Sequence, residues 1–291
     1  MYVHGNNLIQ KEKHRTKYLD ADSKKYLKEI RIMYDKWKKD NEGLIGPTKI
    51  ISDKEEDRET ISKRVSLLND YKDFLDQQHY AEKFDSRSNL HSSVLEEFLF
   101  YLFKDLVGSI SENALIGKSH SFKDIFFKSA NYSEMVSAPN ALIEIKDHDF
   151  SIGCSVTASM TCNGIEEPEI HKWDIPAVAI ECKTYLDKTM LQDVSTAAEQ
   201  LKQKNPNAMY IVVAEWLKLT ESVNLKKYKI DQIYVLRKQK NTDREFRYSD
   251  SYEKNPLYDD TVNHLFFTVR EFLTSDWEGG IVNGLNRGYL I

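Results

Sequence analysis

The run PAVAIECK, residues 176–183, constrains the fold of this chain more than any other segment. Residues 177–180 are all small or apolar, which is the pattern of a strand buried on both faces. The strand continues directly into a carboxylate, a thiol and an ammonium, from Glu181, Cys182 and Lys183. Burying charge at a strand end is costly unless the charges are paired or hold a ligand. The run therefore predicts a sheet covered on both faces, with a charged pair at one strand end that needs a partner.

The composition predicts one large domain, with or without appended elements. With 291 residues and 41% hydrophobic content the chain can bury a sizeable core, and 30% charged and 11% aromatic residues are typical of a soluble globular protein. No apolar run approaches the ~20 residues of a membrane helix, and the N-terminus lacks a signal-peptide core. Cys154, Cys162 and Cys182 show no CxxC spacing, so neither a disulfide framework nor a zinc site is indicated. We expect a reduced, intracellular protein.

The net charge of −5 argues against a protein that coats nucleic acid with a uniformly basic surface. It does not exclude a protein that binds DNA locally and uses carboxylates to hold a metal. The charge is also uneven, because residues 11–40 are basic while SDKEEDRET, residues 52–60, is acidic. A charged run is usually the solvated face of a helix, and residues 11–40 taken alone favour that interpretation.

Two helices are expected in the N-terminal part of the chain. Between residues 24 and 39 apolar side chains recur every three or four positions, which predicts an amphipathic helix. The segment NEGLIGPTK, residues 41–49, contains the glycines and proline that end it. A second helix is expected within residues 62–78. Together these segments predict an N-terminal helical region over residues 1–85.

Two capping-box patterns place further helices. They open helices expected over residues 92–107 and 190–204, and Asn205-Pro206 ends the second one. The pairs are Ser93 with Glu96 and Thr189 with Gln192. The segment 107–140 gives no clear pattern.

Five expected strands set the fold class. They cover residues 141–146, 149–160, 176–183, 208–216 and 232–239. Together with the helices the order is α-β-β-β-α-β-β, which predicts an α/β fold, a mixed sheet with helices packed on it. This core spans residues 86–245. A last helix, over residues 258–273, belongs to a C-terminal extension over residues 246–291.

The end of the strand 176–183 carries the residues best suited to chemistry. Alternation along a strand places Glu181 and Lys183 on one face and Cys182 on the other. An acid and an ammonium so placed can act on a phosphodiester, because the acid binds Mg²⁺ while the lysine orients or deprotonates the attacking water. Asp149, which opens the neighbouring strand, is the expected second metal ligand. Cys182 would contribute only its backbone carbonyl to the metal.

A Glu-x-Lys tripeptide alone is weak evidence, since one or two are expected by chance in ~300 residues. The chain contains another, Glu144-Ile145-Lys146. Its alternation with apolar residues indicates a half-exposed strand, so cross-strand pairing suffices to explain it. For Glu181 and Lys183 the alternative is a buried salt bridge. We favour a functional site, because charges at a strand end beside a second acid are a poor way to gain stability.

Three more ionisable residues lie near the expected site. Glu96 already has a role as the capping-box acid, so Glu97 is the expected auxiliary acid near the metal, with a solvent-exposed position as the alternative. His148 could act as a base. A histidine beside two aspartates is more often a hydrogen-bonded structural residue, and no catalytic role is assigned to it.

The order of these elements, with an acid followed by Glu-x-Lys, resembles the PD-(D/E)XK nuclease superfamily. More narrowly, the chain resembles the BbvCI-like type II restriction endonucleases. The resemblance is densest from residue 85 to 237. The segments that carry it are YVHGNN, FDSRSN, SSVLEEFLFYLF, KDHDFSIG, PAVAIECKTYL, VVAEWLKL and IYVLR.

This resemblance implies a Mg²⁺-dependent endonuclease of the bacterial cytoplasm that serves restriction-modification defence. It would cut double-stranded DNA at a short specific site and leave 5′-phosphate and 3′-hydroxyl ends. By the resemblance, Asp149 and Glu181 would be metal ligands and Lys183 the catalytic lysine. His148 stands where the superfamily motif often has proline, so Asp147 could compete with Asp149.

The resemblance also implies two-subunit assemblies with one active site for each DNA strand. The partner would be a second copy or a related subunit, which would read a palindrome or an asymmetric site respectively. Several segments are candidates for DNA contacts or equally for surface solubility. They are residues 11–40, Arg87 and Asn89, and Arg237, Lys238 and Lys240.

Two other functions remain open from the sequence. The first is a structure-specific repair or recombination nuclease with the same site. The second is a non-catalytic DNA-binding subunit in which the charged residues are remnants, and the intact Glu181-Cys182-Lys183 triplet argues against it.

Overall fold

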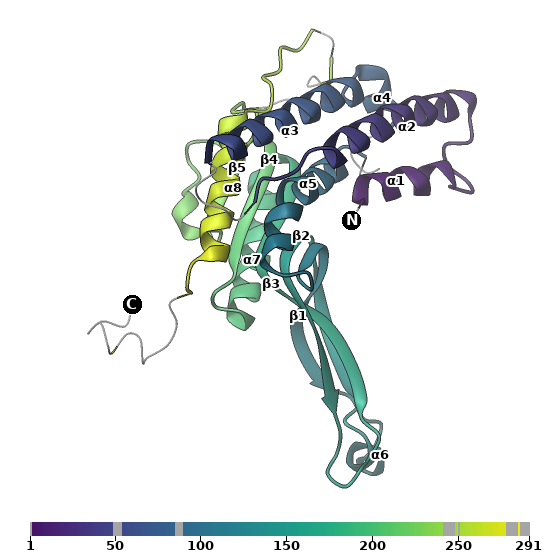
Figure 1. Ribbon diagram of the computed structural model, residues 1–291. Helices are drawn as coiled ribbons and strands as arrows, with labels where there is room; N and C mark the ends of the chain where they lie inside the picture. The colour runs from purple at the N-terminus through teal and green to yellow at the C-terminus, as the bar shows by residue number, and fades with distance from the viewer. Residues whose placement is uncertain are drawn as a thin grey trace.

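The computed structural model describes residues 2–48, 54–84, 90–240, 248–249, 251–277 and 285. Its centre is a five-stranded mixed sheet with the order β1-β2-β3-β4-β5 (Figure 1). The first three strands are antiparallel, and β3, β4 and β5 are parallel. The strands are β1 Leu115–Phe127, β2 Ala141–Met160, β3 Glu169–Leu186, β4 Met209–Leu217 and β5 Gln232–Val235. The expected mixed α/β sheet is confirmed.

The helices lie before, between and after these strands. A short 3₁₀ turn, Leu225–Lys227, precedes β5. The helices are α1 Val3–Glu12, α2 Ala21–Glu42, α3 Lys54–Leu75, α4 Gln78–Lys83, α5 Ser92–Ile110, α6 Tyr132–Ser137, α7 Lys188–Lys204 and α8 Asp259–Thr274. None of the described helices is long and apolar enough to cross a membrane.

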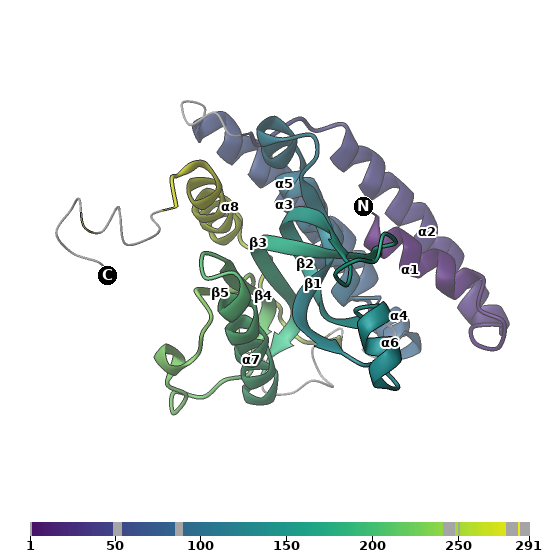
Figure 2. The same cartoon turned by 90° about the horizontal axis from the view of Figure 1, so that it is seen from below.

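Helices cover both faces of the sheet, as the apolar run in β3 requires. Ile180 belongs to a core cluster with apolar residues of α5 and α8. Ala179, the preceding residue, belongs to a second cluster with residues of α7. Figure 2 shows α7 and α8 on opposite sides of the sheet. Val178, Ala179 and Ile180 are fully buried, so the predicted burial of this strand on both faces is confirmed.

The N-terminal and C-terminal helices share one apolar core with the sheet. Leu27 on α2, Leu68 on α3, Leu99 on α5 and Phe266 on α8 lie in the same cluster as Ile180. The predicted division of the chain into three regions, with boundaries at residues 85 and 245, stays a prediction, and residues from all three regions belong to this one core cluster.

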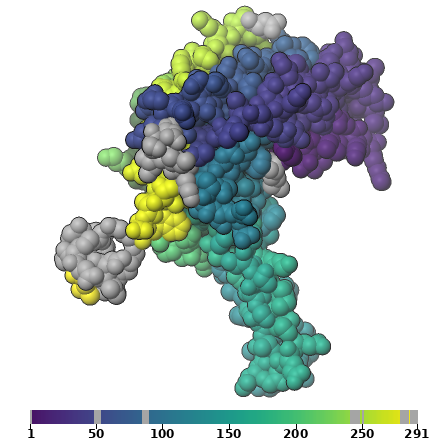
Figure 3. Space-filling model, viewed as in Figure 1, coloured from purple at the N-terminus to yellow at the C-terminus, as the bar shows by residue number. Residues whose placement is uncertain are grey.

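Strand β2 bends back on itself and forms part of an arm. The carboxylate of Glu169 accepts hydrogen bonds from the backbone N–H groups of Asn140 and Ala141, while Glu169 pairs with Met160 along the ladder. Both ends of this 20-residue strand thus lie beside one residue, although a straight strand of that length would span about 65 Å. The strands β1, β2 and β3 leave the body together as an arm with α6 at its tip (Figures 1 and 3).

The strand predictions differ from the structure in two places. The segment 107–140 contains β1, which the sequence did not indicate, and residues 141–146 and 149–160 form the single bent strand β2. The two errors compensate, because apart from the short helix α6 between β1 and β2 the order from α5 is one helix, three strands, one helix and two strands. The other predicted strands and helices lie where they were expected, with ends that differ by several residues, and the short helices α1, α4 and α6 were not predicted.

The capping interpretations were wrong, although the helix starts are close. Ser93 lies inside α5, where its hydroxyl donates to the carbonyl of Leu90, so it is not the N-cap. Asp187 caps α7, because its carboxylate accepts from the backbone N–H of Met190. Thr189 lies inside that helix.

Candidate active site

The strands β2 and β3 separate at the root of the arm, and the candidate site lies at this point. Their antiparallel pairing runs from Met160 and Glu169 to Phe150 and Ile180. The next residues along the two strands are Asp149 and Glu181. The carboxylate of Asp149 accepts a hydrogen bond from the backbone N–H of Cys182 at 2.9 Å. Asp149 therefore connects the two strands where they diverge.

Asp149, Glu181 and Lys183 come together as the sequence pattern predicts. The ammonium of Lys183 lies 3.1 Å from Asp149 Oδ2 and 2.9 Å from Glu181 Oε2. The three side chains are partly accessible, with exposed fractions of 25% for Lys183, 28% for Asp149 and 11% for Glu181. Two carboxylates thus meet around a single cation at a site that solvent can reach.

The other oxygen of Glu181 faces the protein interior. Glu181 Oε1 accepts a hydrogen bond from the hydroxyl of Tyr210 at 3.1 Å and lies 3.4 Å from Nδ1 of His148. Tyr210 and His148 are both buried. Tyr210 was not predicted as a site residue, because it stands in the apolar run of β4.

Electrostatics keep Lys183 positively charged. Burial acts to lower the pKa of Lys183, but the charges of Asp149 and Glu181 outweigh burial and raise the pKa above its usual value. Burial and the charge of Glu181 raise the pKa of Asp149. Burial also acts to raise the pKa of Glu181, but hydrogen bonds from His148 and Lys183 hold that pKa below its usual range. Lys183 therefore suits a role as a hydrogen-bond donor and a positive charge.

Glu96, on α5, interacts electrostatically with Asp149 and Lys183 of this site. Burial and the charge of Asp149 raise the pKa of Glu96 to about 7. Its Oε2 lies 3.5 Å from the ammonium of Lys118. The same oxygen is buried without a hydrogen-bond partner among the described residues.

The structure does not bring Glu97 to the site. The side chain of Glu97 is fully buried, and its carboxylate accepts from the hydroxyls of Tyr34 and Tyr101 and from the backbone N–H groups of His4 and Gly5. These donors belong to α1, α2 and α5, and none of them belongs to the strands that carry Asp149 and Glu181. Glu97 thus anchors the start of α1, and neither an auxiliary metal ligand nor a solvent-exposed acid fits its position.

The alternative candidates for metal binding and catalysis have other surroundings. The carboxylate of Asp147 is largely exposed and pairs with His120 at 2.7 Å. Glu144 pairs across the strands with Lys123, which agrees with the structural interpretation of Glu144-Ile145-Lys146. The thiol of Cys182 is buried in the core, and burial raises its pKa well above the usual value. The Cys182 side chain is thus unsuited to bind a metal.

The donor set fits a hard divalent cation. Mg²⁺ is commonly held by one or two carboxylates and keeps several of its waters. Asp149 and Glu181 provide such a pair, and Glu96, whose Oε2 lies 3.5 Å from the ammonium of Lys118, is a third acid that interacts electrostatically with Asp149. Among the described residues, no group of three or more His, Cys, Asp or Glu side chains is placed so that it could hold a metal ion.

A family model described as Bpu10I restriction endonuclease matches residues 87–290. The chain belongs to the Bpu10I restriction endonuclease family. A solved structure described as the native BbvCI A2B2 tetramer at low resolution has the same fold, with a TM-score of 0.67 and 18% sequence identity over 94% of this chain and 97% of that chain. No curated protein matches the sequence. The resemblance to BbvCI-like type II restriction endonucleases is confirmed, and the chain is a nuclease by family.

The residues expected to contact DNA in this Bpu10I family member have different surroundings. Arg237 is fully buried and pairs with Asp76 and Glu215, so the expectation that it contacts DNA was wrong. Lys238 and Lys240 are exposed and pair with acids. The basic segment 11–40 exposes several cations. They include Lys13, Arg15, Lys17, Lys24, Lys25 and Lys28. Arg87 and Asn89 lie outside the described residues.

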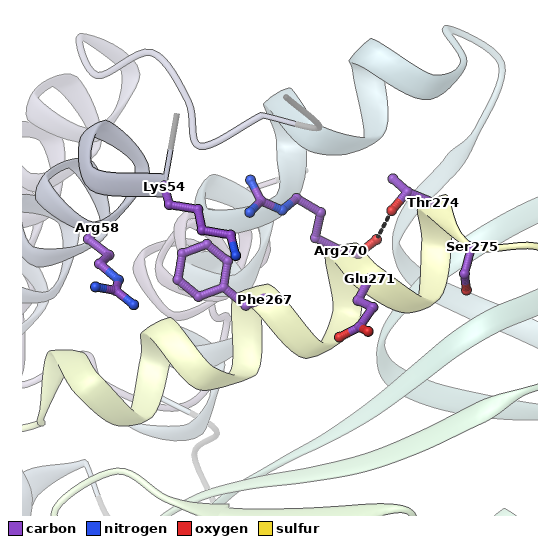
Figure 4. Close-up of a pocket in the computed structure, with 7 residues that line it drawn as sticks. All are labelled: Lys54, Arg58, Phe267, Arg270, Glu271, Thr274 and Ser275. Carbon is purple, nitrogen blue, oxygen red and sulfur yellow. Dashed lines mark hydrogen bonds between the residues drawn. The ribbon is translucent and has the colours of Figure 1, made fainter. Parts of the chain in front are cut away.

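A cavity of about 490 Å³ lies away from this site, between the start of α3 and the end of α8. Lys54 and Arg58 of α3 point toward Phe267 of α8, and Arg270 lies beside them (Figure 4). The cavity contains none of Asp149, Glu181 and Lys183. In the Bpu10I family member the open cavity and the catalytic candidates are therefore separate.

Proposed function

We propose that this chain is a type II site-specific endonuclease that hydrolyses phosphodiester bonds in double-stranded DNA with Mg²⁺. One observation carries the proposal, the meeting of Asp149 and Glu181 around the ammonium of Lys183 at the accessible root of the arm. The family membership supports DNA as the substrate. The enzyme would act in restriction-modification defence in the bacterial cytoplasm.

Asp149 and Glu181 hold the metal in this proposal, and the backbone carbonyl of Cys182 is a further ligand. Mg²⁺ bound there would act as a Lewis acid on the scissile phosphate. Lys183 carries a positive charge, so its ammonium donates to the attacking water or to a phosphate oxygen and offsets the charge that develops during the reaction. The products are 5′-phosphate and 3′-hydroxyl ends.

Glu96 takes the auxiliary role first expected for Glu97. It is buried, electrostatically close to Asp149 and has one oxygen without a hydrogen bond among the described residues. Burial and a neighbouring acid both raise the pKa of a carboxyl group. Acids with a pKa raised in this way are common in functional sites. A bound cation near both acids would offset the repulsion between the carboxylates of Glu96 and Asp149.

The active form is an assembly of two subunits, each with one active site for one DNA strand. The structural neighbour is described as an A2B2 tetramer, so the partner is a second copy or a related subunit. The arm offers apolar surface for the contact, because Phe127, Tyr132 and Met135 near its tip are 63%, 79% and 60% exposed. Light scattering tests this assignment. Tyr132→Glu should lower the molar mass of the assembly, and an unchanged mass would exclude the arm tip as the contact.

Digestion of a mixed-sequence plasmid, with and without Mg²⁺, tests the activity. The proposal expects discrete fragments with Mg²⁺ and none with EDTA. Cutting that depends on flaps or junctions would instead favour a structure-specific nuclease. Binding without cutting, with Mg²⁺ and a partner subunit supplied, would favour a non-catalytic DNA-binding subunit.

A further inference from the structure

The two carboxylate oxygens of Glu181 have different neighbours. Oε2 lies 2.9 Å from the ammonium of Lys183, on the side of Asp149. Oε1 accepts the hydroxyl proton of Tyr210 at 3.1 Å and lies 3.4 Å from Nδ1 of His148. One oxygen therefore faces the proposed metal position, and the other is held by buried side chains.

The residues that hold Oε1 are buried and make further contacts. Tyr210 is fully buried on β4, where it pairs with Ala179 of β3, and its backbone N–H donates to Asp231 at 2.6 Å. The rings of His148 and Tyr210 meet edge to face, with centroids 5.5 Å apart. Three neighbouring strands thus contribute to one cluster behind Glu181.

The protons in this cluster can be assigned from the contacts. A carboxylate only accepts hydrogen bonds, so the Tyr210 hydroxyl must donate to Glu181 Oε1. Nδ1 of His148 lies 3.3 Å from that hydroxyl oxygen and 3.4 Å from Glu181 Oε1, so its N–H can be shared between the two acceptors. Nε2 of His148 is buried without a partner among the described residues. The cluster directs its donors at Glu181.

We propose that Tyr210, supported by His148, is a positioning residue that fixes the Glu181 carboxylate with Oε2 directed at the metal. The inference rests on the proposed metal site. Mg²⁺ demands near-octahedral geometry, so a carboxylate that rotates freely binds it less well. Partners that orient a metal ligand typically contribute 10–100-fold in metal affinity or activity. Tyr210 touches neither the substrate nor the metal.

Metal binding by Tyr210→Phe tests the inference. This change removes one hydroxyl and keeps the ring. The affinity of the protein for Mn²⁺, measured by calorimetry, should fall about tenfold or more. The Mg²⁺ concentration for half-maximal plasmid cleavage should rise by a similar factor, while DNA affinity in Ca²⁺ stays the same.

Tyr234→Phe is the matched control. Tyr234 is also a buried tyrosine of the sheet, and its hydroxyl contacts His264 and Thr268, away from Glu181. This variant should keep the Mn²⁺ affinity of the wild type. Equal losses in both variants would overturn the inference, because they would reflect general destabilisation.

A second pair of variants covers the case in which Tyr210→Phe does not fold. His148→Ala removes the donor beside Glu181, whereas His148→Asn keeps a nitrogen near the position of Nδ1. Mn²⁺ affinity should fall in the first and largely return in the second. Equal affinity in both would contradict a positioning role for His148.

Glu181→Gln separates failure of the inference from failure of the proposed function. If Glu181→Gln binds Mn²⁺ as tightly as the wild type does, the metal site itself is wrong. If Glu181→Gln loses Mn²⁺ while Tyr210→Phe retains it, only the positioning role of Tyr210 is wrong.

Discussion

Asp149 accepts a hydrogen bond from the backbone N–H of Cys182 at the point where β2 and β3 separate. The same carboxylate oxygen contacts the ammonium of Lys183. One side chain thus closes the gap between two strands and forms half of the proposed metal site. The following predictions separate these two roles.

Asp149→Asn should abolish cleavage and leave the fold intact. The amide oxygen can still accept from Cys182, but the charge that holds the metal is lost. Asp149→Ala should also lower the free energy of unfolding by about 1–3 kcal/mol, because the Cys182 N–H loses its partner. Cleavage assays and urea unfolding of both variants measure the two effects. Equal stability of Asn and Ala variants would contradict the connecting role of Asp149.

Lys183→Ala should reduce the cleavage rate by at least two orders of magnitude, since a positioned charge at such a site contributes ~3 kcal/mol or more. Binding to a cognate duplex in Ca²⁺ should change little. Lys146→Ala is the matched control, because Lys146 ends the other Glu-x-Lys tripeptide and is exposed. Single-turnover plasmid cleavage measures both. Undiminished cleavage by Lys183→Ala would remove the proposed mechanism.

Glu96→Gln should affect mainly the cleavage rate, whereas Glu97→Gln should affect mainly the stability of the fold. Glu96→Gln should slow cleavage at least tenfold without lowering stability at neutral pH, because it removes an acid near Asp149. Glu97→Gln should lower the free energy of unfolding by about 3 kcal/mol, since it disrupts buried hydrogen bonds to a charged group. Thermal unfolding and cleavage assays compare the two. A Glu97 variant that is stable but inactive would reverse the assignment.

Stability should depend on pH through Glu96. Its pKa is about 7 in the folded protein and ordinarily 4.5. Between these pH values the folded protein keeps a proton that the unfolded chain has lost, so this group lowers the free energy of unfolding as pH rises. Glu96→Gln cannot titrate. Its stability relative to the wild type should rise by about 3 kcal/mol from pH 4.5 to pH 8 in EDTA. Parallel urea-unfolding profiles would show that Glu96 has an ordinary pKa.

The sequence was sufficient for features that depend on local pattern. The apolar run before Glu181 predicts a buried strand, and alternation then places Glu181 and Lys183 on one face. The core order of helices and strands followed from similar patterns. Strand β1 was missed because its segment includes Gly117, Lys118, Ser119 and His120, which do not form an apolar run.

The sequence was insufficient where distant residues meet. Glu96 and Glu97 are adjacent on α5, and about 100° of helix rotation decides which one faces Asp149. The capping-box pattern assigned Glu96 to the start of the helix and so left Glu97 as the expected site acid. The buried donors around Glu97 come from α1 and α2, which are far away in the chain. Arg237 is buried because Asp76, 161 residues away, pairs with it. The role of Tyr210 likewise depends on a contact between strands.

The most direct test of the metal site is diffraction from crystals of the protein with a DNA duplex and Mn²⁺, using the anomalous signal of the metal. The account predicts a peak within coordination distance of a carboxylate oxygen of both Asp149 and Glu181, with Lys183 moved toward the scissile phosphate. A metal bound elsewhere, or held by only one of these two carboxylates, would contradict it.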